Sequence, residues 1–228
     1  MTRPAHFKFT AGQFARIGLK VGDDLVVRAY SIVSSPFDET LEFFSIVVPD
    51  GAFTSNLQHL EVTDELYLEK VPYGFLTLAR YQLPLPQDLW LLGTGTGLAP
   101  FLSMLQDFET WQKYQKINLV YSVRTEAELA YADRIAEIVE MFGEGHTGFQ
   151  FIPIITRDPH AQLHERLPVL IANGDLEKVA GFTLNPETSH VMLCGNPQMV
   201  DDTKDALKAR GLTMNRRGEG NIAVENYW

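Results

Sequence analysis

The chain has 228 residues, of which 45% are hydrophobic and 21% charged. This length and composition exclude an intrinsically disordered protein and a lone small module, and they fit one large domain or two of ordinary size. With 19 Lys and Arg against 29 Asp and Glu, the net charge is -10, so nucleic acid is not expected as the main partner.

Cysteine usage and the apolar runs indicate the cellular compartment of the protein. The single cysteine, Cys194, cannot form an internal disulfide, and no secretory signal is recognised. The longest uncharged stretch, residues 89–106, contains three glycines and a proline where a spanning helix would have Leu or Ile. We therefore expect a cytoplasmic protein without a membrane span.

The first part of the chain, residues 9–78, consists of short runs of strand-forming residues separated by turns. Strands are expected at 24–27, 41–48 and 65–71, with a short helix at 55–60. This pattern predicts an antiparallel β-barrel or sandwich. Pro84 and Pro86 then favour an extended connector, so we divide the chain into domains of residues 1–83 and 84–228.

After the connector, compact apolar strands alternate with helices. Strands are expected at 89–92, 117–123, 149–156 and 191–194, and helices at 126–141, 163–173 and 197–210, with a core-facing helical stripe of Phe101, Met104, Leu105 and Phe108. Asn196 is placed to cap the last helix, with Pro197 in its first turn and Gly211 beyond its end. The alternation predicts right-handed crossovers and a parallel sheet.

A glycine-rich turn joins the first of these strands to its helix. Its sequence, Gly93-Thr94-Gly95-Thr96-Gly97 followed by Pro100, departs from the dinucleotide fingerprint G-x-G-x-x-G. Glycines allow a phosphate to approach the backbone, and the N–H groups at a helix start favour negative charge. We expect a dinucleotide pyrophosphate here, and the alternative is a tight turn that needs glycine for packing alone.

Polar and basic residues follow the next two strands. Ser122 and Arg124 come after the second strand, Arg157 after the third, and Arg166 a few residues later. Ligands of open parallel sheets bind at the carboxyl ends of strands, and a 2′-phosphate is held by guanidinium groups where a ribose hydroxyl would meet Asp or Glu. We predict NADP(H) as the dinucleotide. A solvated surface charge is the alternative for each arginine taken singly.

Five spaced motifs occur in the order typical of one family. They are Arg28-Ala29-Tyr30-Ser31, Gly51-Ala52-Phe53-Thr54-Ser55-Asn56, the glycine-rich turn ending at Pro100, Cys194-Gly195-Asn196-Pro197-Gln198-Met199, and Glu225-Asn226-Tyr227-Trp228. From residue 9 to 228 the chain resembles the bacterial ferredoxin (flavodoxin)–NADP+ reductases, particularly the type ending in Tyr-Trp. The resemblance implies a ferredoxin reductase-like fold, with an antiparallel β-barrel FAD-binding domain followed by an α/β parallel-sheet NADP-binding domain.

The resemblance also implies roles for single residues. Arg28 corresponds to a ligand of the FAD pyrophosphate, Tyr30 to the ring on one flavin face, and Ser31 to a group near flavin N5. The loop with Gly51, Thr54 and Ser55 corresponds to the second pyrophosphate contact. Ala29 belongs to the first FAD-binding motif, between Arg28 and Tyr30. The remaining assignments place Cys194 beside the nicotinamide, Glu225 in proton handling, Tyr227 on the opposite flavin face and Trp228 on adenine. The implied catalytic group is Ser31, Cys194, Glu225 and Tyr227.

The implied reaction passes hydride from NADPH to flavin N5 and then single electrons to ferredoxin or flavodoxin. Because such acceptors are acidic, we predict docking near Arg210, Arg216 and Arg217 on a monomer. The alternatives are the reductase component of an oxygenase, a general NADPH diaphorase, and a dinucleotide-sensing module without turnover.

Two features of the sequence are not explained by the family motifs, namely its short start and a pair of histidines. Family members usually carry about two more strands before the segment at residue 9, so either the true start lies upstream or the barrel is shortened and has an open edge. His160 and His164 are spaced i, i+4, but no acidic or cysteine ligands accompany them. We expect a solvated or capping role for both, and no metal.

Overall fold

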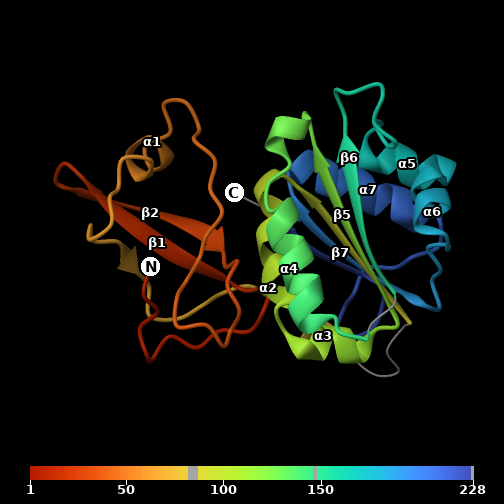
Figure 1. Ribbon diagram of the computed structural model, residues 1–228, viewed down its shortest axis with the longest axis horizontal. Helices are drawn as coiled ribbons and strands as arrows, with labels where there is room; N and C mark the ends of the chain where they lie inside the picture. The colour runs from red at the N-terminus through yellow and green to blue at the C-terminus, as the bar shows by residue number, and fades with distance from the viewer. Residues whose placement is uncertain (82–86, 146–147, 227–228) are drawn as a thin grey trace.

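The computed structural model describes residues 1–81, 87–145 and 148–226. Two sheets form from consecutive parts of the chain and lie side by side in Figure 1. The first is antiparallel with strand order β2-β1-β3, and the second is parallel with order β6-β5-β4-β7-β8. The prediction of an antiparallel part followed by a parallel part is confirmed. The domain boundary predicted between residues 83 and 84 lies outside the described residues.

The antiparallel sheet is built on a hairpin of β1 (Phe14–Val21) and β2 (Asp24–Ser31), and β3 (Tyr67–Leu68) pairs with the other side of β1. Ala15, Ile17 and Leu19 alternate along β1 and are buried, as the period of a half-buried strand requires. The helix expected at 55–60 is α1 (Thr54–Leu57). Strands β2 and β3 form the two edges of this sheet, so the described residues give the first domain an open edge.

Two strand predictions in this domain are wrong in extent. Residues 41–48 form no strand, and Phe43 makes a single bridge to Ile32. The run predicted at 65–71 is reduced to β3. A strand-forming sequence becomes a strand when a neighbouring backbone pairs with it, and these segments lack a continuous partner within the described residues.

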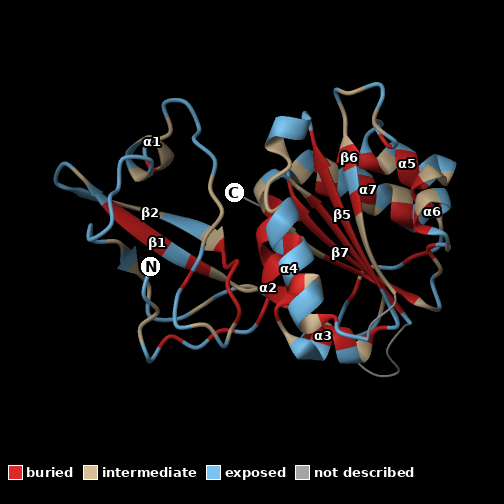
Figure 2. Cartoon of the chain, in the orientation of Figure 1, coloured by how far each residue is buried: buried red, intermediate tan, exposed pale blue. Residues whose placement is uncertain are grey.

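The parallel sheet contains β4 (Asp88–Thr94), β5 (Lys116–Val123), β6 (Phe149–Ile155), β7 (Ser189–Gly195) and β8 (Ile222–Asn226). Its strands are nearly continuous apolar runs because helices cover both faces. One face carries α2 (Ala99–Leu105), α3 (Phe108–Lys113) and α4 (Ala132–Phe142), and the other carries α5 (Leu167–Asn173), α6 (Asp175–Ala180) and α7 (Pro197–Ala209). Figure 2 shows the strands buried between these two layers.

Short turns of 3-10 helix complete the chain path at η1 (Leu78–Arg80), η2 (Gly95–Leu98) and η3 (Glu126–Glu128). The helix predicted over 126–141 is therefore divided into η3 and α4. Tyr131, between them, has left-handed backbone with φ 64°, and its hydroxyl donates to Glu42 Oε1 of the first domain at 2.7 Å. The helical pattern is thus interrupted at a residue that contacts the other domain.

Two further helix predictions have different outcomes. Asn196 caps α7, where its side chain accepts from the backbone N–H groups of Gln198 and Met199. Of the predicted core stripe on α2 and α3, Phe101, Met104 and Leu105 are fully buried, whereas Phe108 is 53% exposed. The stripe stops at Phe108 because α2 ends at Leu105 and the chain turns before α3 begins.

Buried hydrogen bonds join the two domains. Ser103 Oγ on α2 donates to the carbonyl of Ser34 at 2.8 Å, and Gln106 Nε2 donates to that of Val33 at 2.8 Å. Ser35 Oγ returns a bond to the carbonyl of Gln106 at 3.0 Å. The start of the parallel domain is therefore held against the segment that follows β2.

Within residues 1–81, 87–145 and 148–226, no helix is both long and apolar enough to pass through a bilayer. In the same part of the chain, His, Cys, Asp and Glu side chains do not gather in groups of three or more that could hold a metal ion.

Candidate active site

Three of the sequence motifs meet at the carboxyl edge of the parallel sheet. Gly93 of β4 is the register partner of Cys194 on β7, and Cys194 is in turn the partner of Glu225 on β8. Ser31, the last residue of β2, approaches from the first domain, and its Oγ donates to Glu225 Oε1 at 3.3 Å. The structure thus brings Ser31, Cys194 and Glu225 together where the two domains meet.

The carboxyl of Glu225 is held largely away from water. Burial raises its pKa from 4.5 to about 7, and the hydrogen bond from Ser31 opposes that shift. Gly74 closes one side of the carboxyl, since a Cβ at that position would lie 2.8 Å from Glu225 Oε2. A carboxyl that gains and loses its proton near neutral pH is suited to proton transfer.

The glycine-rich turn packs against the turn after β7. A Cβ at Gly97 would overlap the carbonyl of Cys194, and one at Gly195 would overlap Thr94 Oγ1. Thr94 Oγ1 also accepts from the backbone N–H of Asn196 at 3.1 Å. Close packing therefore explains Gly97 and Gly195.

Gly95, between Gly93 and Gly97, has a different setting. Its φ is +54°, and no heavy atom lies within 4 Å of the position that a Cβ would occupy. The residue requires left-handed backbone and leaves open space above it. The open side of the turn is where a phosphate has room to approach.

The predicted flavin residues lie on and beside β2. Tyr30 packs against Phe53 with ring centroids 5.7 Å apart, and its hydroxyl accepts from Ser45 Oγ at 3.2 Å. Ser31 is buried, whereas Arg28 and Ala29 are exposed. Arg28 Nη1 donates to the carbonyl of its neighbour Val27 at 2.7 Å.

The second predicted flavin loop is ordered by its own hydrogen bonds. Thr54 Oγ1 accepts from the N–H of Val48 at 3.0 Å, and Ser55 Oγ donates to the carbonyl of Gly51. This arrangement leaves a run of aliphatic side chains open to water, with Ile46, Val47 and Val48 at 58%, 51% and 50% exposure. Ser45, which precedes this strip, contacts Tyr30, so an aromatic ring and an exposed apolar surface are available to a large planar cofactor.

The predicted nucleotide residues follow the ends of β4, β5 and β6. Thr94 and Ser122 are register partners, and Thr96 follows two residues after Thr94, in η2. The N–H of Arg157 donates to the carbonyl of Arg124 at 2.8 Å, so these two arginines lie next to each other beyond the strand ends. Arg166 stands apart, exposed at the N-cap of α5.

Sequence reasoning missed Glu128, which is in direct contact with one of these arginines. Arg124 Nε donates to Glu128 Oε1 at 2.8 Å, and the two side chains form an ion pair. The spacing of Arg and Glu at i and i+4 was the available signal, although η3 is a 3-10 turn and not the α-helix that usually gives this spacing its meaning.

The predicted docking arginines are not equivalent. Arg210 Nη2 donates to Glu177 Oε1 at 2.9 Å, and Nη1 donates to the carbonyl of Ile171 at 3.1 Å. Because Glu177 is buried, its charge is balanced by Arg210, and this pairing leaves Arg210 less available to a protein partner. Arg216 and Arg217 are exposed. Tyr227 and Trp228 lie outside the described residues.

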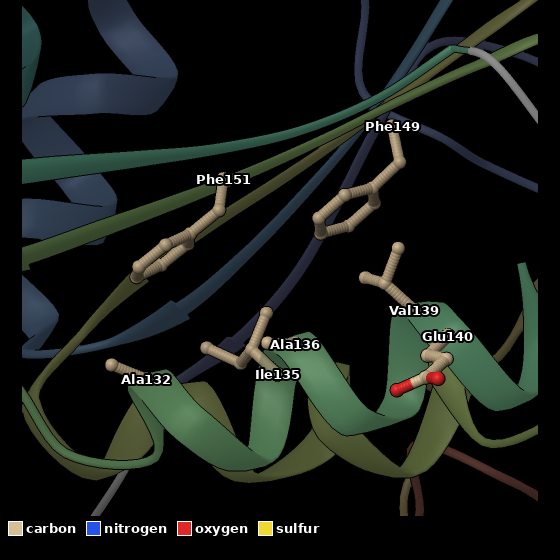
Figure 3. A pocket seen from close by; sticks show the side chains of 7 residues that line it. All are labelled: Ala132, Ile135, Ala136, Val139, Glu140, Phe149 and Phe151. Atoms are coloured by element: carbon tan, nitrogen blue, oxygen red, sulfur yellow. The ribbon is translucent and has the colours of Figure 1, made fainter.

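A concavity elsewhere on the molecule contains none of the predicted site residues. It is a groove of about 410 Å³ between α4 and the edge strand β6, lined by Ala132, Ile135, Ala136, Val139, Glu140, Phe149 and Phe151 (Figure 3). Its single charged group, Glu140, has no catalytic neighbour among these residues. The candidate site therefore remains the group of residues at the carboxyl edge of the sheet.

Known proteins match both parts of the chain. A family model described as oxidoreductase FAD-binding domain matches residues 1–77, and one described as oxidoreductase NAD-binding domain matches residues 91–205. The chain is 41% identical to the ferredoxin–NADP reductase of Pseudomonas aeruginosa, over 98% of this chain and 88% of that protein. The chain belongs to the ferredoxin–NADP reductase family. Its resemblance to that family is confirmed.

Other members of the ferredoxin–NADP reductase family agree with this placement. The flavodoxin/ferredoxin–NADP reductase of Escherichia coli is 40% identical over 96% of this chain and 88% of its own length. A crystal structure of a ferredoxin NADP+ reductase from Neisseria gonorrhoeae with bound FAD and NADP superposes with a TM-score of 0.90 at 38% identity, covering 99% of this chain and 89% of that one. The ferredoxin reductase-like fold, with an FAD-binding and an NAD-binding domain, is thereby confirmed.

Proposed function

We propose that this reductase family member transfers electrons between NADPH and ferredoxin or flavodoxin, with FAD as its resident cofactor. The supporting observation is the hydrogen bond from Ser31 to Glu225, which connects the FAD-binding domain to the carboxyl edge of the parallel sheet. When bound, FAD supplies the capacity to take up a hydride and to release electrons one at a time.

The residues of the first domain are suited to hold FAD. Arg28 offers a guanidinium to the pyrophosphate, and the loop of Gly51, Thr54 and Ser55 offers backbone N–H groups and hydroxyls. Tyr30, with Ala29 beside it on β2, offers an aromatic face. The exposed aliphatic run after Ser45 becomes covered when a planar ring lies there.

The chain's own groups orient and protonate at the reacting centre. Ser31 offers a hydroxyl, and Glu225 exchanges a proton near neutral pH. Cys194 is fully buried beside Glu225 in the sheet and fixes one wall of the nicotinamide site. The turn of Gly93 to Gly97 presents backbone N–H groups to the dinucleotide phosphates. We propose Ser122, Arg124, Arg157 and Arg166 as the groups that recognise NADP(H).

We assign the two terminal aromatic residues from the family resemblance. Tyr227 would cover the second flavin face and Trp228 the adenine. If Tyr227 has to move aside before nicotinamide stacks, Tyr227→Ser should tighten NADP+ binding measured by flavin difference spectra. Unchanged affinity would argue against a gating ring.

Anaerobic stopped-flow on the purified protein tests the proposed function. We expect a yellow protein whose flavin is reduced faster by NADPH than by NADH and reoxidised by ferredoxin or flavodoxin. Reoxidation by ferricyanide alone would favour a diaphorase or an oxygenase reductase component. A colourless protein that binds nucleotide without turnover would favour a sensing module.

We propose Arg216 and Arg217 as the docking patch for the acidic acceptor. Reversing both charges, Arg216→Glu with Arg217→Glu, should slow ferredoxin reduction about tenfold and leave ferricyanide reduction unchanged, because the charges act on encounter with the protein partner. Lys178→Glu is the matched control, since Lys178 is exposed on α6, on the sheet face remote from the first domain. Equal losses with both acceptors would contradict docking.

We further propose that the protein acts as a cytoplasmic monomer with its domains divided between residues 83 and 84. A single, buried cysteine requires no oxidising compartment. Light scattering of the FAD-loaded protein tests whether it is a monomer, and fractionation of cells tests its location.

A further inference from the structure

A carboxylate already occupies the groups that we propose for the 2′-phosphate. Arg124 Nε donates to Glu128 Oε1 at 2.8 Å, and Arg124 Nη2 pairs with the same oxygen. The backbone N–H of Arg124 donates to Glu128 Oε2 at 3.0 Å. Both carboxylate oxygens are thus engaged by donors that an anionic ligand would use.

The surroundings keep this carboxylate charged. Hydrogen bonds from Arg124 lower the pKa of Glu128, and the positive charge of Arg157 adds to the effect. The backbone of Glu128 is also fixed, because its N–H donates to the carbonyl of Thr125 at 3.0 Å. A negative charge therefore lies against the Arg124 guanidinium at the end of β5, within electrostatic reach of Arg157.

The ion pair is accessible and easily separated. The side chain of Arg124 is 64% exposed and that of Glu128 is 36% exposed. Exposed pairs of this kind contribute little to stability, so a ligand can displace the carboxylate by rotating the Glu128 side chain. Displacement still costs free energy. This cost weakens the binding of a ligand that needs Arg124 and does not affect a ligand that does not.

We propose that Glu128 is a specificity-determining residue that competes with the 2′-phosphate for Arg124 and so reduces the preference for NADPH over NADH. Carboxylate and phosphate compete for the same guanidinium and N–H donors, and their like charges repel each other. At this position of a parallel sheet, a carboxylate is also the group that accepts from the ribose 2′-hydroxyl of NAD. The inference rests on the proposed function, because it takes the arginine edge as the 2′-phosphate site.

Calorimetry on the FAD-loaded protein tests the competition. The probes are adenosine 2′,5′-bisphosphate, which carries the 2′-phosphate, and AMP, which lacks it. We expect Glu128→Gln to tighten bisphosphate binding about three- to tenfold and to leave AMP binding within about twofold. Glu126→Gln is the matched control, since Glu126 lies in the same turn but is not a partner of Arg124. It should behave as the wild type.

Glu128→Ala provides a second variant that removes the side chain and should shift the preference in the same direction. In steady-state kinetics, the ratio of kcat/KM for NADPH to that for NADH should rise by a similar factor in both variants. Bisphosphate binding that is unchanged or weaker, or equal tightening of AMP, would overturn the proposal. Failure of the proposed function has a separate signature, namely flavin in the wild type that NADPH does not reduce.

Discussion

Glu225 shows how a single side chain links stability to chemistry. The residue is half-buried and its carboxyl is desolvated, so the neutral form is favoured and the pKa rises from 4.5 to about 7. An unfolded chain releases this proton near pH 4.5, whereas the folded chain retains it. The contribution of Glu225 to stability is therefore greatest below about pH 4.5 and is lost as the pH rises toward 7.

Replacing this carboxyl with an amide should remove both effects. We expect Glu225→Gln to raise the free energy of unfolding above pH 7, because no charge has to be buried, and to remove the change in flavin reduction rate near neutral pH. Urea unfolding and stopped-flow with NADPH, each between pH 5 and 9, are the measurements. Glu219→Gln, an exposed position just before β8, is the control. A retained pH dependence in Glu225→Gln would assign it to another group.

At the residue scale, the sequence located the groups that the structure brings together where they belong to a local motif. The motif around Ser31 and that around Cys194 are contiguous in sequence, and both reach the same edge of the structure. Glu128 was missed because its role depends on a turn that bends it back onto Arg124. The ion pair of Arg210 with Glu177 could not be predicted either, because Glu177 lies 33 residues away on another helix.

At the scale of elements, the glycine-rich turn and the turn after β7 act as one packed unit. Gly97→Ala should destabilise the protein by about 2 kcal/mol or more and weaken NADP+ binding, because the added Cβ meets backbone of β7 that cannot move aside. Gly95→Ala has space for its Cβ and should cost about 1 kcal/mol from its positive φ. Urea unfolding and NADP+ titration compare the two. Equal effects would contradict the packing argument.

The amino end of β7 contains a buried histidine with aromatic partners. His190 stacks on Tyr81 with ring centroids 3.5 Å apart, and its Nδ1 lies 2.8 Å from Tyr114 Oη. Burial lowers the pKa of His190 from 6.5 to about 3. Between these two values the unfolded chain therefore binds a proton at His190 and the folded chain does not. Stability is lost as the pH falls from about 6.5 toward 3.

Substitution of this histidine should change acid stability in particular. We expect the free energy of unfolding of the wild type to fall more steeply between pH 6.5 and 5 than that of His190→Gln, as followed by urea titrations. His164→Gln removes an exposed imidazole instead and should retain the wild-type slope. Parallel curves for the wild type and His190→Gln would show that the histidine does not contribute.

Element predictions failed where pairing partners are remote. The parallel strands β4 to β7 were anticipated because each is a compact apolar run flanked by helical pattern. Strand β8 was not, because a short segment with Glu and Asn shows its register only against β7. Residues 41–48 have strand composition without a ladder, and Tyr131, where the predicted helix is interrupted, contacts Glu42 in the other domain.

At the scale of the whole molecule, Gln106 connects the two domains. Its Nε2 donates to the carbonyls of Val33 and Leu102, and its Oε1 accepts from Arg134. Gln106→Ala should cost about 2 kcal/mol, because the buried carbonyl of Val33 loses its donor, and should slow flavin reduction by NADPH through looser alignment of the domains. Gln112→Ala, at an exposed position of α3, is the control for urea unfolding and stopped-flow. A loss of stability without any change in the rate of flavin reduction would show that Gln106 holds the domains together but does not align them for the reaction.

The place of β8 in the sheet has a consequence for biosynthesis. This strand follows the other strands of the parallel sheet in the chain, and it forms one border of that sheet and brings the carboxyl that meets Ser31. A nascent or prematurely terminated chain that stops before residue 222 contains the glycine-rich turn and the arginines but lacks Glu225. Under the proposed function, the residues that recognise the nucleotide therefore come before the residue that handles the proton, and a truncated product lacks a complete electron-transfer centre.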